Sequence, residues 1–217
     1  MITNLCFHGI GTCITEREPG EARYWVSEHL FLEVLDAVRG LEHVRLSFDD
    51  GNRSDLTLAL PALVERGLTA TFFALAGRLE DPASLSAADL RELRAAGMTI
   101  GTHGWAHVPW RGLDDREVRR ELADARVALA EASGGPVDEA ALPLGRYDRR
   151  LLGQLRRNGY RRVYSSDRLP TRPEVWLQPR YSITSSDTVE SVRQLLDPRP
   201  GIRHVRARLA GVVKRLR

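Results

Sequence analysis

The chain has 217 residues, of which 42% are hydrophobic and 28% charged, a composition typical of a folded globular domain and not of a disordered chain. The formal net charge is +3, but the segment 198–217 carries seven basic residues and no acidic one, so residues 1–197 have a net charge of −4. A nucleic-acid-binding domain would carry positive charge on its folded body, and we therefore expect no nucleic-acid partner.

No apolar run reaches the roughly 18 residues that span a bilayer, and the first residues lack the basic and apolar regions of a secretory signal. The only two cysteines, Cys6 and Cys13, are too few for a disulfide framework. Together these features predict reduced thiols and a cytoplasmic protein.

Short apolar runs alternate with helical patterns along most of the chain. Strands are predicted at 2–8, 43–48, 69–75, 98–102, 140–143, 162–165 and 180–183. Helices are predicted at 28–38, 55–66, 87–96, 115–132, 149–158 and 188–196, with a kink or late start at Pro61 and an N-cap at Ser86.

This alternation predicts an α/β fold in which helices cover a parallel sheet. About seven β–α units are fewer than a full eight-unit barrel uses, so we expect a distorted or incomplete (β/α)7 barrel, with an open doubly wound sheet as the alternative. In both architectures, catalytic groups gather at the carboxyl ends of the strands. Polar side chains follow the predicted strands at that end: His8, Asp49, Asp50, His103, His107, Arg146 and Asp167.

Two short segments carry most of the chemistry. Asp49 and Asp50 follow a strand, and His103 and His107 are four residues apart. Each segment has an ordinary explanation by itself, an acidic turn in one case and a pair of surface or core histidines in the other. Together, however, one carboxylate and two imidazoles provide three ligands and leave room for water, as in a catalytic zinc site, while the second carboxylate remains available as a general base. This set predicts hydrolysis by attack of water on a carbonyl.

The motifs also resemble those of a known family. Ser-Phe-Asp-Asp-Gly at 47–51, His-Gly-Trp-Ala-His at 103–107, and the weaker Leu-Pro-Leu-Gly-Arg-Tyr at 142–147 followed by Asn-Gly-Tyr at 158–160 are similar to motifs of the polysaccharide deacetylase superfamily, carbohydrate esterase family 4. The similarity covers about residues 3–196. It implies a barrel of the NodB homology type over 1–197, and an enzyme that removes N-acetyl groups from an amino-sugar-containing saccharide by attack of a metal-bound water.

The resemblance also assigns roles to residues. Asp49 matches the catalytic base, and Asp50, His103 and His107 match the ligands of a divalent metal, usually Zn²⁺ and in some members Co²⁺ or Ni²⁺. The backbone N–H of Leu144 matches the oxyanion donor, since a main-chain group is kept whatever the side chain.

The sequence departs from the family pattern at two roles. The arginine that usually supports the base is replaced by Ala141, so Arg146 or Arg180 is expected to substitute for it, with ordinary surface arginines as the alternative. The usual C-terminal histidine acid is missing. Cys-Phe-His-Gly-Ile at 6–10 resembles the N-terminal segment of the branch that includes poly-N-acetylglucosamine deacetylases, which implies that His8 is the general acid, with a structural hydrogen-bonding role as the alternative. Asp167 is expected either to orient His8 or an arginine, or to form a turn.

Tryptophans are candidates for stacking on a sugar, because aromatic faces bind sugar rings but also fill cores. Trp105, between the two histidines, is expected to face the site, and Trp25, Trp110 and Trp176 are weaker candidates.

The tail 198–217 places apolar residues at helical spacing opposite Arg and Lys. This pattern is typical of a basic amphipathic helix that either lies on an anionic membrane, as a peripheral contact at its inner face, or packs on the domain. Two other functions remain open: a carbohydrate-binding member with impaired catalysis, and a hydrolase of a non-sugar amide.

Overall fold

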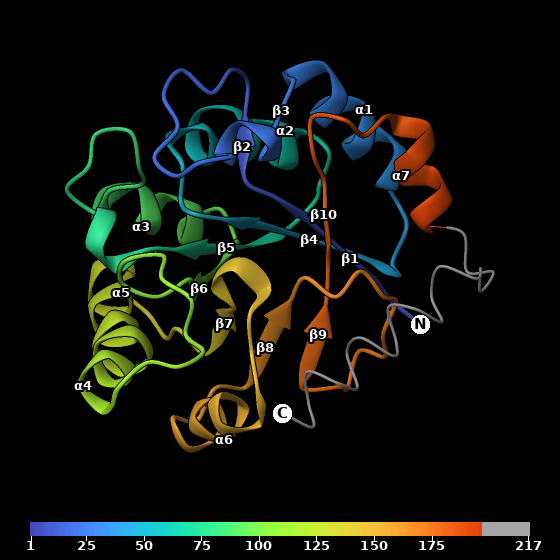
Figure 1. Cartoon of the computed structure of the whole chain (residues 1–217). Helices are drawn as coiled ribbons and strands as arrows, with labels where there is room; N and C mark the ends of the chain where they lie inside the picture. Colours follow the sequence, from blue (N-terminus) through green and yellow to red (C-terminus); the bar gives the residue numbers. More distant parts are fainter. Residues whose placement is uncertain (197–217) are drawn as a thin grey trace.

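The computed structural model describes residues 1–196, so the predicted basic tail at 198–217 lies outside the described residues. Its main feature is a sheet of eight parallel strands (Figure 1). In spatial order these are β10 (Tyr181–Ser182), β1 (Thr3–Phe7), β4 (Val44–Asp49), β5 (Ala70–Ala74), β6 (Thr99–Thr102), β7 (Glu139–Ala141), β8 (Arg162–Ser165) and β9 (Leu177–Pro179).

The two ends of the sheet are joined by one bent strand. β9 pairs with β8, β10 pairs with β1, and only Arg180 separates them in the chain. The backbone N–H of Arg180 still donates to Ser165 at 2.8 Å, after which the chain crosses to β1. The sheet is therefore a nearly closed barrel, and it has seven strands when β9 and β10 are counted as one bent strand. The prediction of a distorted (β/α)7 barrel is confirmed, and the alternative of an open doubly wound sheet is wrong.

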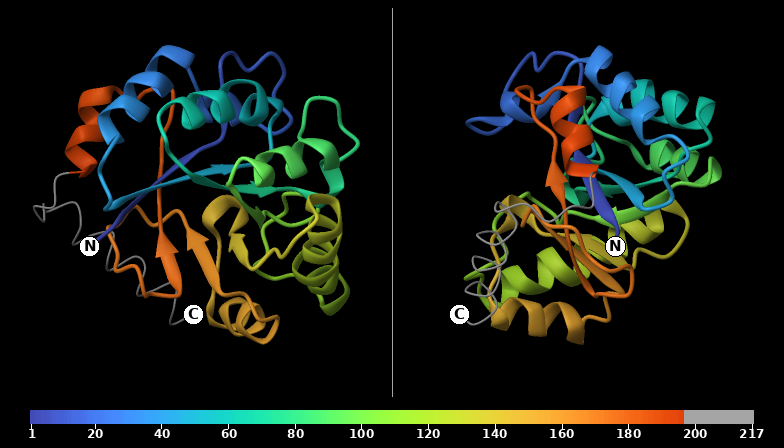
Figure 2. Two further views of the ribbon diagram at one scale, coloured as in Figure 1. Left: turned by 180° about the vertical axis from the view of Figure 1, so that it is seen from behind. Right: turned by 90° about the vertical axis from the view of Figure 1, so that its right-hand side faces the viewer.

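Helices cover the outside of the barrel (Figures 1 and 2). They are α1 (Glu28–Val38), α2 (Leu60–Glu65), α3 (Ala87–Ala95), α4 (Asp115–Val118), α5 (Ala125–Ser133), α6 (Arg149–Arg157) and α7 (Val189–Leu196). The connection between β8 and β9 contains no helix, and α7 instead packs beside α1 after the last strand. Within residues 1–196, no helix combines the length and apolar character needed to cross a membrane.

Local sequence signals explain where several helices begin. Ser86 is the N-cap of α3, as predicted: its side chain accepts a hydrogen bond from the N–H of Asp89, and the carboxylate of Asp89 accepts one from the N–H of Ser86, which completes a capping box. The helix predicted at 55–66 divides near Pro61: a π-helical turn, Asp55–Ala59, leads into α2, and the proline lies in the first turn of α2, where its missing N–H is tolerated.

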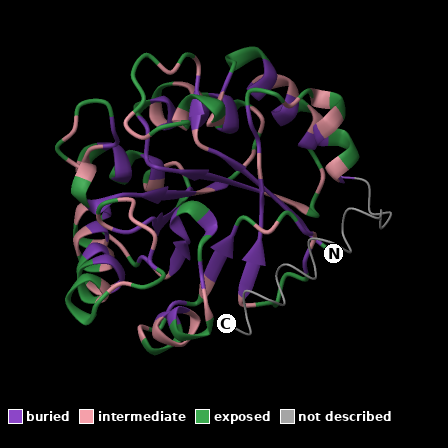
Figure 3. Cartoon of the chain, in the orientation of Figure 1, coloured by how far each residue is buried: buried purple, intermediate pink, exposed green. Residues whose placement is uncertain are grey.

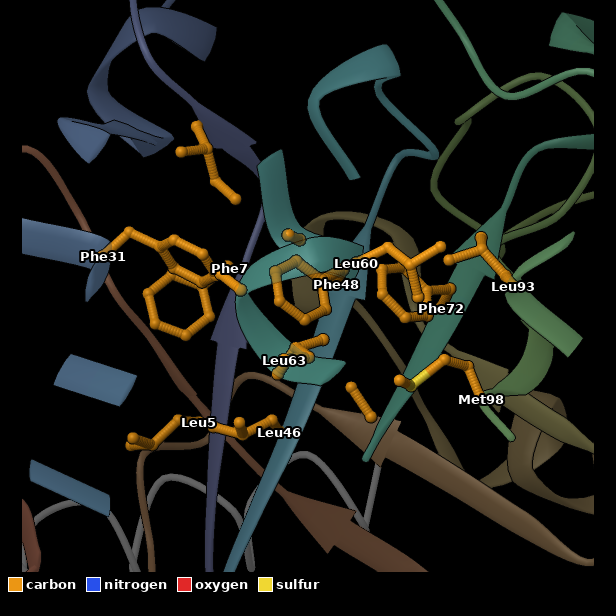
Figure 4. Close-up of a cluster of buried hydrophobic side chains, with 14 of the residues drawn as sticks. Leu5, Phe7, Phe31, Leu46, Phe48, Leu60, Leu63, Phe72, Leu93 and Met98 are labelled. Carbon is orange, nitrogen blue, oxygen red and sulfur yellow. The ribbon is translucent and has the colours of Figure 1, made fainter. Parts of the chain in front are cut away.

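The outer faces of the strands form the main hydrophobic core (Figures 3 and 4). Alternate residues of a strand point to opposite faces, and the register places Phe7, Phe48 and Phe72 side by side on β1, β4 and β5. Their rings stack with centroid distances of 5.5 Å for Phe7–Phe48 and 4.6 Å for Phe48–Phe72, and Phe31 of α1 contacts the first two. Burial of these rings holds the helices against the barrel.

The intervening residues point into the barrel, and many are polar. Ser47 and Asp49 alternate with Leu46 and Phe48 along β4, and all four are buried. The hydrophobic face thus anchors β4 while the inner face delivers a carboxylate to the carboxyl end of the barrel.

A second, two-stranded sheet is absent from the predicted elements. β2 (Gly9–Ile10) pairs in parallel with β3 (Trp25–Val26), and residues 11–24 form an excursion between them that includes a short 3-10 helix, Glu21–Tyr24. The ring of Trp25 packs over Gly9, where an added Cβ would lie 2.2 Å from it, so only glycine allows this contact. The pairing holds both ends of the excursion beside the end of β1.

Candidate active site

Both aspartates of the first motif are buried at the end of β4. Asp49 is its last residue, and Asp50 follows in a left-handed conformation with φ 73°. Such a backbone is unfavourable for residues other than glycine. Within residues 1–196 it occurs at four non-glycine residues, and three of them belong to predicted site positions: Asp50, His107 and Leu144. Strained backbone of this kind gathers at functional sites, where the surrounding structure maintains it.

The histidine motif forms a loop that is organised by a buried carboxylate. Glu121 accepts hydrogen bonds from the backbone N–H groups of Trp105, at 2.7 Å, and Ala106, at 3.2 Å. Gly104 has φ 93°, and an added Cβ would lie 2.4 Å from an oxygen of Glu121. The turn therefore requires glycine, and it directs the two histidine rings toward each other, with their centroids 5.0 Å apart.

Three side chains converge on one point. Oδ1 of Asp50 lies 3.5 Å from Nε2 of His103 and 3.3 Å from Nε2 of His107, and this buried oxygen has no hydrogen-bond partner among the described residues. Nδ1 of His103 lies 2.9 Å from the carbonyl oxygen of Ala141, which only accepts hydrogen bonds, so Nδ1 carries the proton. In the neutral ring the lone pair of Nε2 then faces the carboxylate. The donor set of one carboxylate oxygen and two imidazole nitrogens fits a divalent metal.

A second group of possible ligands lies deeper in the barrel but fits a metal less well. Atoms of Cys6, His8 and Asp49 lie within 4.8 Å of one another. Both oxygens of Asp49, however, accept hydrogen bonds from Arg180, so this carboxylate is already neutralised. Both Cys6 and Cys13 are free thiols.

Arg180 contacts the carboxylate of Asp49, the predicted base. Its Nη1 and Nη2 each donate to one oxygen of Asp49 at 2.6 Å, and Nη1 also donates to Ser47 at 3.0 Å. Of the two arginines expected to replace the missing one, Arg180 contacts both oxygens of Asp49, whereas Arg146 is exposed at the edge of the pocket. The bend between β9 and β10 is what turns Arg180 inward.

Burial and neighbouring charges act in opposite directions on the pKa values of Asp49 and His103. Burial alone would raise the pKa of Asp49, but the Arg180 guanidinium and then His103 outweigh it and hold that pKa well below its usual range. For His103, burial is the largest effect and lowers its pKa to about 4, although Asp49 opposes it. At neutral pH the site therefore combines an ionised carboxylate at Asp49 with a neutral imidazole at His103.

The low pKa of His103 predicts a pH-dependent stability of the metal-free protein. Unfolded His103 binds a proton below its ordinary pKa of 6.5, whereas the folded form does so only near 4. The free energy of unfolding should therefore be level above pH 6.5 and fall toward pH 4, with a slope from this group approaching about 1.4 kcal/mol per pH unit. Urea unfolding at several pH values measures the slope, and His103→Gln should flatten it. An equal slope in that variant would contradict the assignment.

Leu144 is exposed and has a left-handed backbone conformation, with φ 54°. The next residue, Gly145, also has a positive φ, and an added Cβ would lie 1.9 Å from Oγ of Ser166. Leu144 lines the pocket, so its predicted oxyanion role is compatible with its place.

His8 also lines the pocket, and its ring packs against Tyr24 with a centroid distance of 4.8 Å. Its buried Nδ1 has no hydrogen-bond partner among the described residues. Asp167 accepts hydrogen bonds from Tyr147 and Ser165, both at 2.7 Å. The roles of His8 as acid and of Asp167 as an orienting group remain predictions.

The predicted tryptophan platform is wrong, because none of the four candidate Trp side chains lines the pocket. Trp110 is 1% exposed and belongs to a second core cluster, where its Nε1 donates to Glu121 at 3.2 Å. Trp105 packs against Gly77 and under Arg120, because Glu121 fixes its backbone, and Trp25 packs on Gly9. The weaker candidate Trp176 is likewise engaged elsewhere and stacks under Arg156. The aromatic side chain that lines the pocket is Tyr24, which no sequence motif marks.

The site lies in a pocket of about 320 Å³, large enough for a sugar unit. One wall comes from the excursion at 11–24, which was not predicted to contribute. Its Glu18 contacts Nδ1 of His107 at 2.5 Å and accepts a hydrogen bond from Arg78 at 3.4 Å. The pocket thus combines the ligand cluster, the Asp49–Arg180 pair, His8, Leu144 and this segment.

Comparisons with known proteins place the chain among deacetylases. The family model for polysaccharide deacetylase matches residues 38–163. A chitooligosaccharide deacetylase of Rhizobium leguminosarum bv. trifolii is 27% identical over 158 residues, 72% of this chain and 68% of that protein. YxkH of Bacillus subtilis is 26% identical over 117 residues, 54% of this chain and 42% of that protein, so the match spans less than half of that relative.

Solved structures share the fold. Deacetylase PplD of Streptococcus pyogenes, solved in complex with acetate, superposes with a TM-score of 0.76 at 20% identity, covering 91% of this chain and 98% of that one. IcaB of Ammonifex degensii superposes with a TM-score of 0.73 at 22% identity, covering 89% and 96%. With its motifs at the carboxyl end of the same barrel and more than half of its length matched by the family model, the chain belongs to the polysaccharide deacetylase family.

Proposed function

We propose that this protein is a metal-dependent hydrolase that removes N-acetyl groups from an amino-sugar-containing saccharide. The observation that carries the proposal is the convergence of Asp50, His103 and His107 beside the Asp49–Arg180 pair in one pocket. The deacetylase names of the relatives support the reaction type.

Asp50, His103 and His107 would hold the metal. A divalent ion, Zn²⁺ in the first instance and Co²⁺ or Ni²⁺ as alternatives, supplies Lewis-acid polarisation and acidifies water at such a site. One carboxylate and two neutral imidazoles leave a net charge of −1 in the ligand set, which suits a divalent cation.

The other residues supply the proton transfers. Asp49 accepts a proton from the attacking water, and Arg180 keeps its carboxylate ionised and oriented. The oxygen of that water bonds to the acetamide carbonyl carbon, and the N–H of Leu144 donates to the oxyanion that develops. The C–N bond then breaks, and His8 protonates the departing amine, which leaves acetate and a free amino sugar.

Metal analysis and product analysis together test this proposal. The purified protein should contain a divalent metal and should remove acetyl groups from a panel of N-acetylated oligosaccharides, detected by mass spectrometry. Asp50→Asn should weaken metal binding by more than about 100-fold, since a ligand and not a supporting group is lost. Asp115→Asn, which changes an exposed aspartate on α4, is the matched control. A wild-type protein that binds no metal and releases no acetate with added Zn²⁺, Co²⁺ or Ni²⁺ would leave a binding role without catalysis.

A further inference from the structure

His107 is supported by a carboxylate from a segment that is distant in the sequence. Glu18 precedes His107 by 89 residues, and its Oε1 lies 2.5 Å from Nδ1 of that ring. A carboxylate accepts hydrogen bonds and does not donate them, so Nδ1 of His107 carries the proton. The Nε2 atom is thereby left as the acceptor that faces Asp50. The contact fixes both the tautomer and the orientation of the imidazole.

The two histidines differ in how they are supported. His103 donates to the carbonyl oxygen of Ala141, at the end of β7 in the barrel wall. His107 instead depends on a side chain of the excursion 11–24, whose own regular structure is one short 3-10 helix. Groups that orient a metal-binding histidine contribute strongly to metal affinity. One histidine of the candidate metal site is therefore held by the barrel wall, whereas the other is held by the excursion.

Arg17, the neighbour of Glu18, fastens the excursion to the barrel. Its Nη1 donates to Oδ1 of Asn52 at 2.8 Å, and its Nη2 donates to the carbonyl of Ala83 at 3.0 Å and to Oγ of Ser84 at 3.1 Å. Asn52 follows Asp50 by two residues, so the anchor reaches the turn that carries the carboxylate ligand. Arg17 is not among the residues that line the pocket. It therefore acts on the site indirectly, through the excursion that carries Glu18 and through this turn.

We infer that Glu18 is a positioning residue for His107, and that the excursion 11–24, seated by Arg17, completes the metal site. The inference rests on the proposed function in one respect, namely that Asp50, His103 and His107 hold a metal. The same segment supplies Tyr24 to the pocket wall, so one element shapes both the metal site and the space for the sugar.

Metal titration separates this role from a merely structural one. Dissociation constants for Co²⁺ are measured from its visible absorption, and those for Zn²⁺ by competition. The proteins compared are the wild type, Glu18→Ala, Glu18→Gln, Arg17→Gln and a control, Glu28→Gln. The control removes an exposed acidic residue at the start of α1. Glu18→Ala should raise both constants by about 10- to 100-fold. Glu18→Gln should have a smaller effect, because its amide oxygen still accepts from Nδ1. Arg17→Gln should weaken binding although it touches no ligand, and Glu28→Gln should not.

A proton resonance gives a second readout. In the zinc-loaded wild type the Nδ1–H of His107, which is identified by its loss in His107→Gln, should be slowly exchanging and shifted downfield, and it should be lost in Glu18→Ala. Unchanged constants and an unchanged resonance in Glu18→Ala, with metal bound by the wild type, overturn the inference and leave the proposed function intact. Failure of the wild type to bind metal overturns both. If Glu18→Ala does not fold, unchanged constants in both Glu18→Gln and Arg17→Gln overturn the inference.

Discussion

Replacement of Asp49 by Asn should lower kcat for deacetylation by about 10²- to 10⁴-fold, the usual contribution of a general base. The amide is nearly the same shape, but it cannot accept the proton of the attacking water. Asp50, His103 and His107 are untouched, so the bound metal should remain. Metal content and acetate release, measured on the same sample, check both parts.

The contrast with Asp50→Asn makes this test specific. Asp49 and Asp50 are adjacent and equally buried, yet one is paired with Arg180 and the other faces the two histidines. We therefore expect one variant to keep metal without activity and the other to lose metal first. If Asp49→Asn lost its metal, or kept its activity within a few-fold of wild type, the assignment of the base would be wrong.

Replacement of Arg180 by Met should have the largest effect on stability. Removing one partner of a buried ion pair leaves an uncompensated charge and costs about 3–5 kcal/mol of unfolding free energy. Arg180 is 3% exposed, and it donates to Asp49 and also to Ser47. Urea unfolding near neutral pH measures the loss. Arg168→Met, at an exposed arginine that donates to the carbonyl of Ser182, is the control and should change stability by less than about 0.5 kcal/mol.

The same variant should also shift the pH profile. Without the guanidinium, burial becomes the dominant effect on Asp49 and its pKa rises, so the carboxylate protonates at a higher pH. The acidic limb of kcat/KM should therefore move toward neutral pH in Arg180→Met. Adding Asp49→Asn to this variant should cost less stability than the two single changes combined, because each removes the same pair. Additive losses, or an unmoved acidic limb, would show that Arg180 does not support the base.

Arg180 contacts Asp49 from a position in the barrel other than the one that the family pattern gives to an arginine. The family pattern places a supporting arginine at the position of Ala141, at the end of β7, where this chain has only a methyl group. Arg180 reaches the same carboxylate from between β9 and β10, 131 residues from Asp49 in the chain. Both positions lie beside the interior of the barrel, so an arginine at the end of either strand can contact the carboxylate of Asp49.

Local sequence patterns were sufficient to predict the features that depend only on residues close together in the chain. The alternation of apolar strands and amphipathic helices predicted the barrel, because period and burial are properties of short segments. The Asp-Asp-Gly and His-x-x-x-His motifs predicted the cluster of Asp50, His103 and His107, since each motif lies at the carboxyl end of a strand. Parallel strands bring those ends together whatever the details of the connections.

Only the tertiary structure decided which residues that are distant in the sequence contact one another. It selected Arg180 over Arg146, because the bend that nearly closes the barrel turns one arginine inward. It buried Trp110 and turned Trp105 away from the pocket, because Glu121, in the π-helical segment Arg119–Asp124, fixes the histidine loop. It brought Glu18 to His107 from an excursion without a motif. The sequence by itself determined which groups could hold a metal and move a proton, whereas folding determined which neighbours orient them, since those contacts join segments that no local pattern relates.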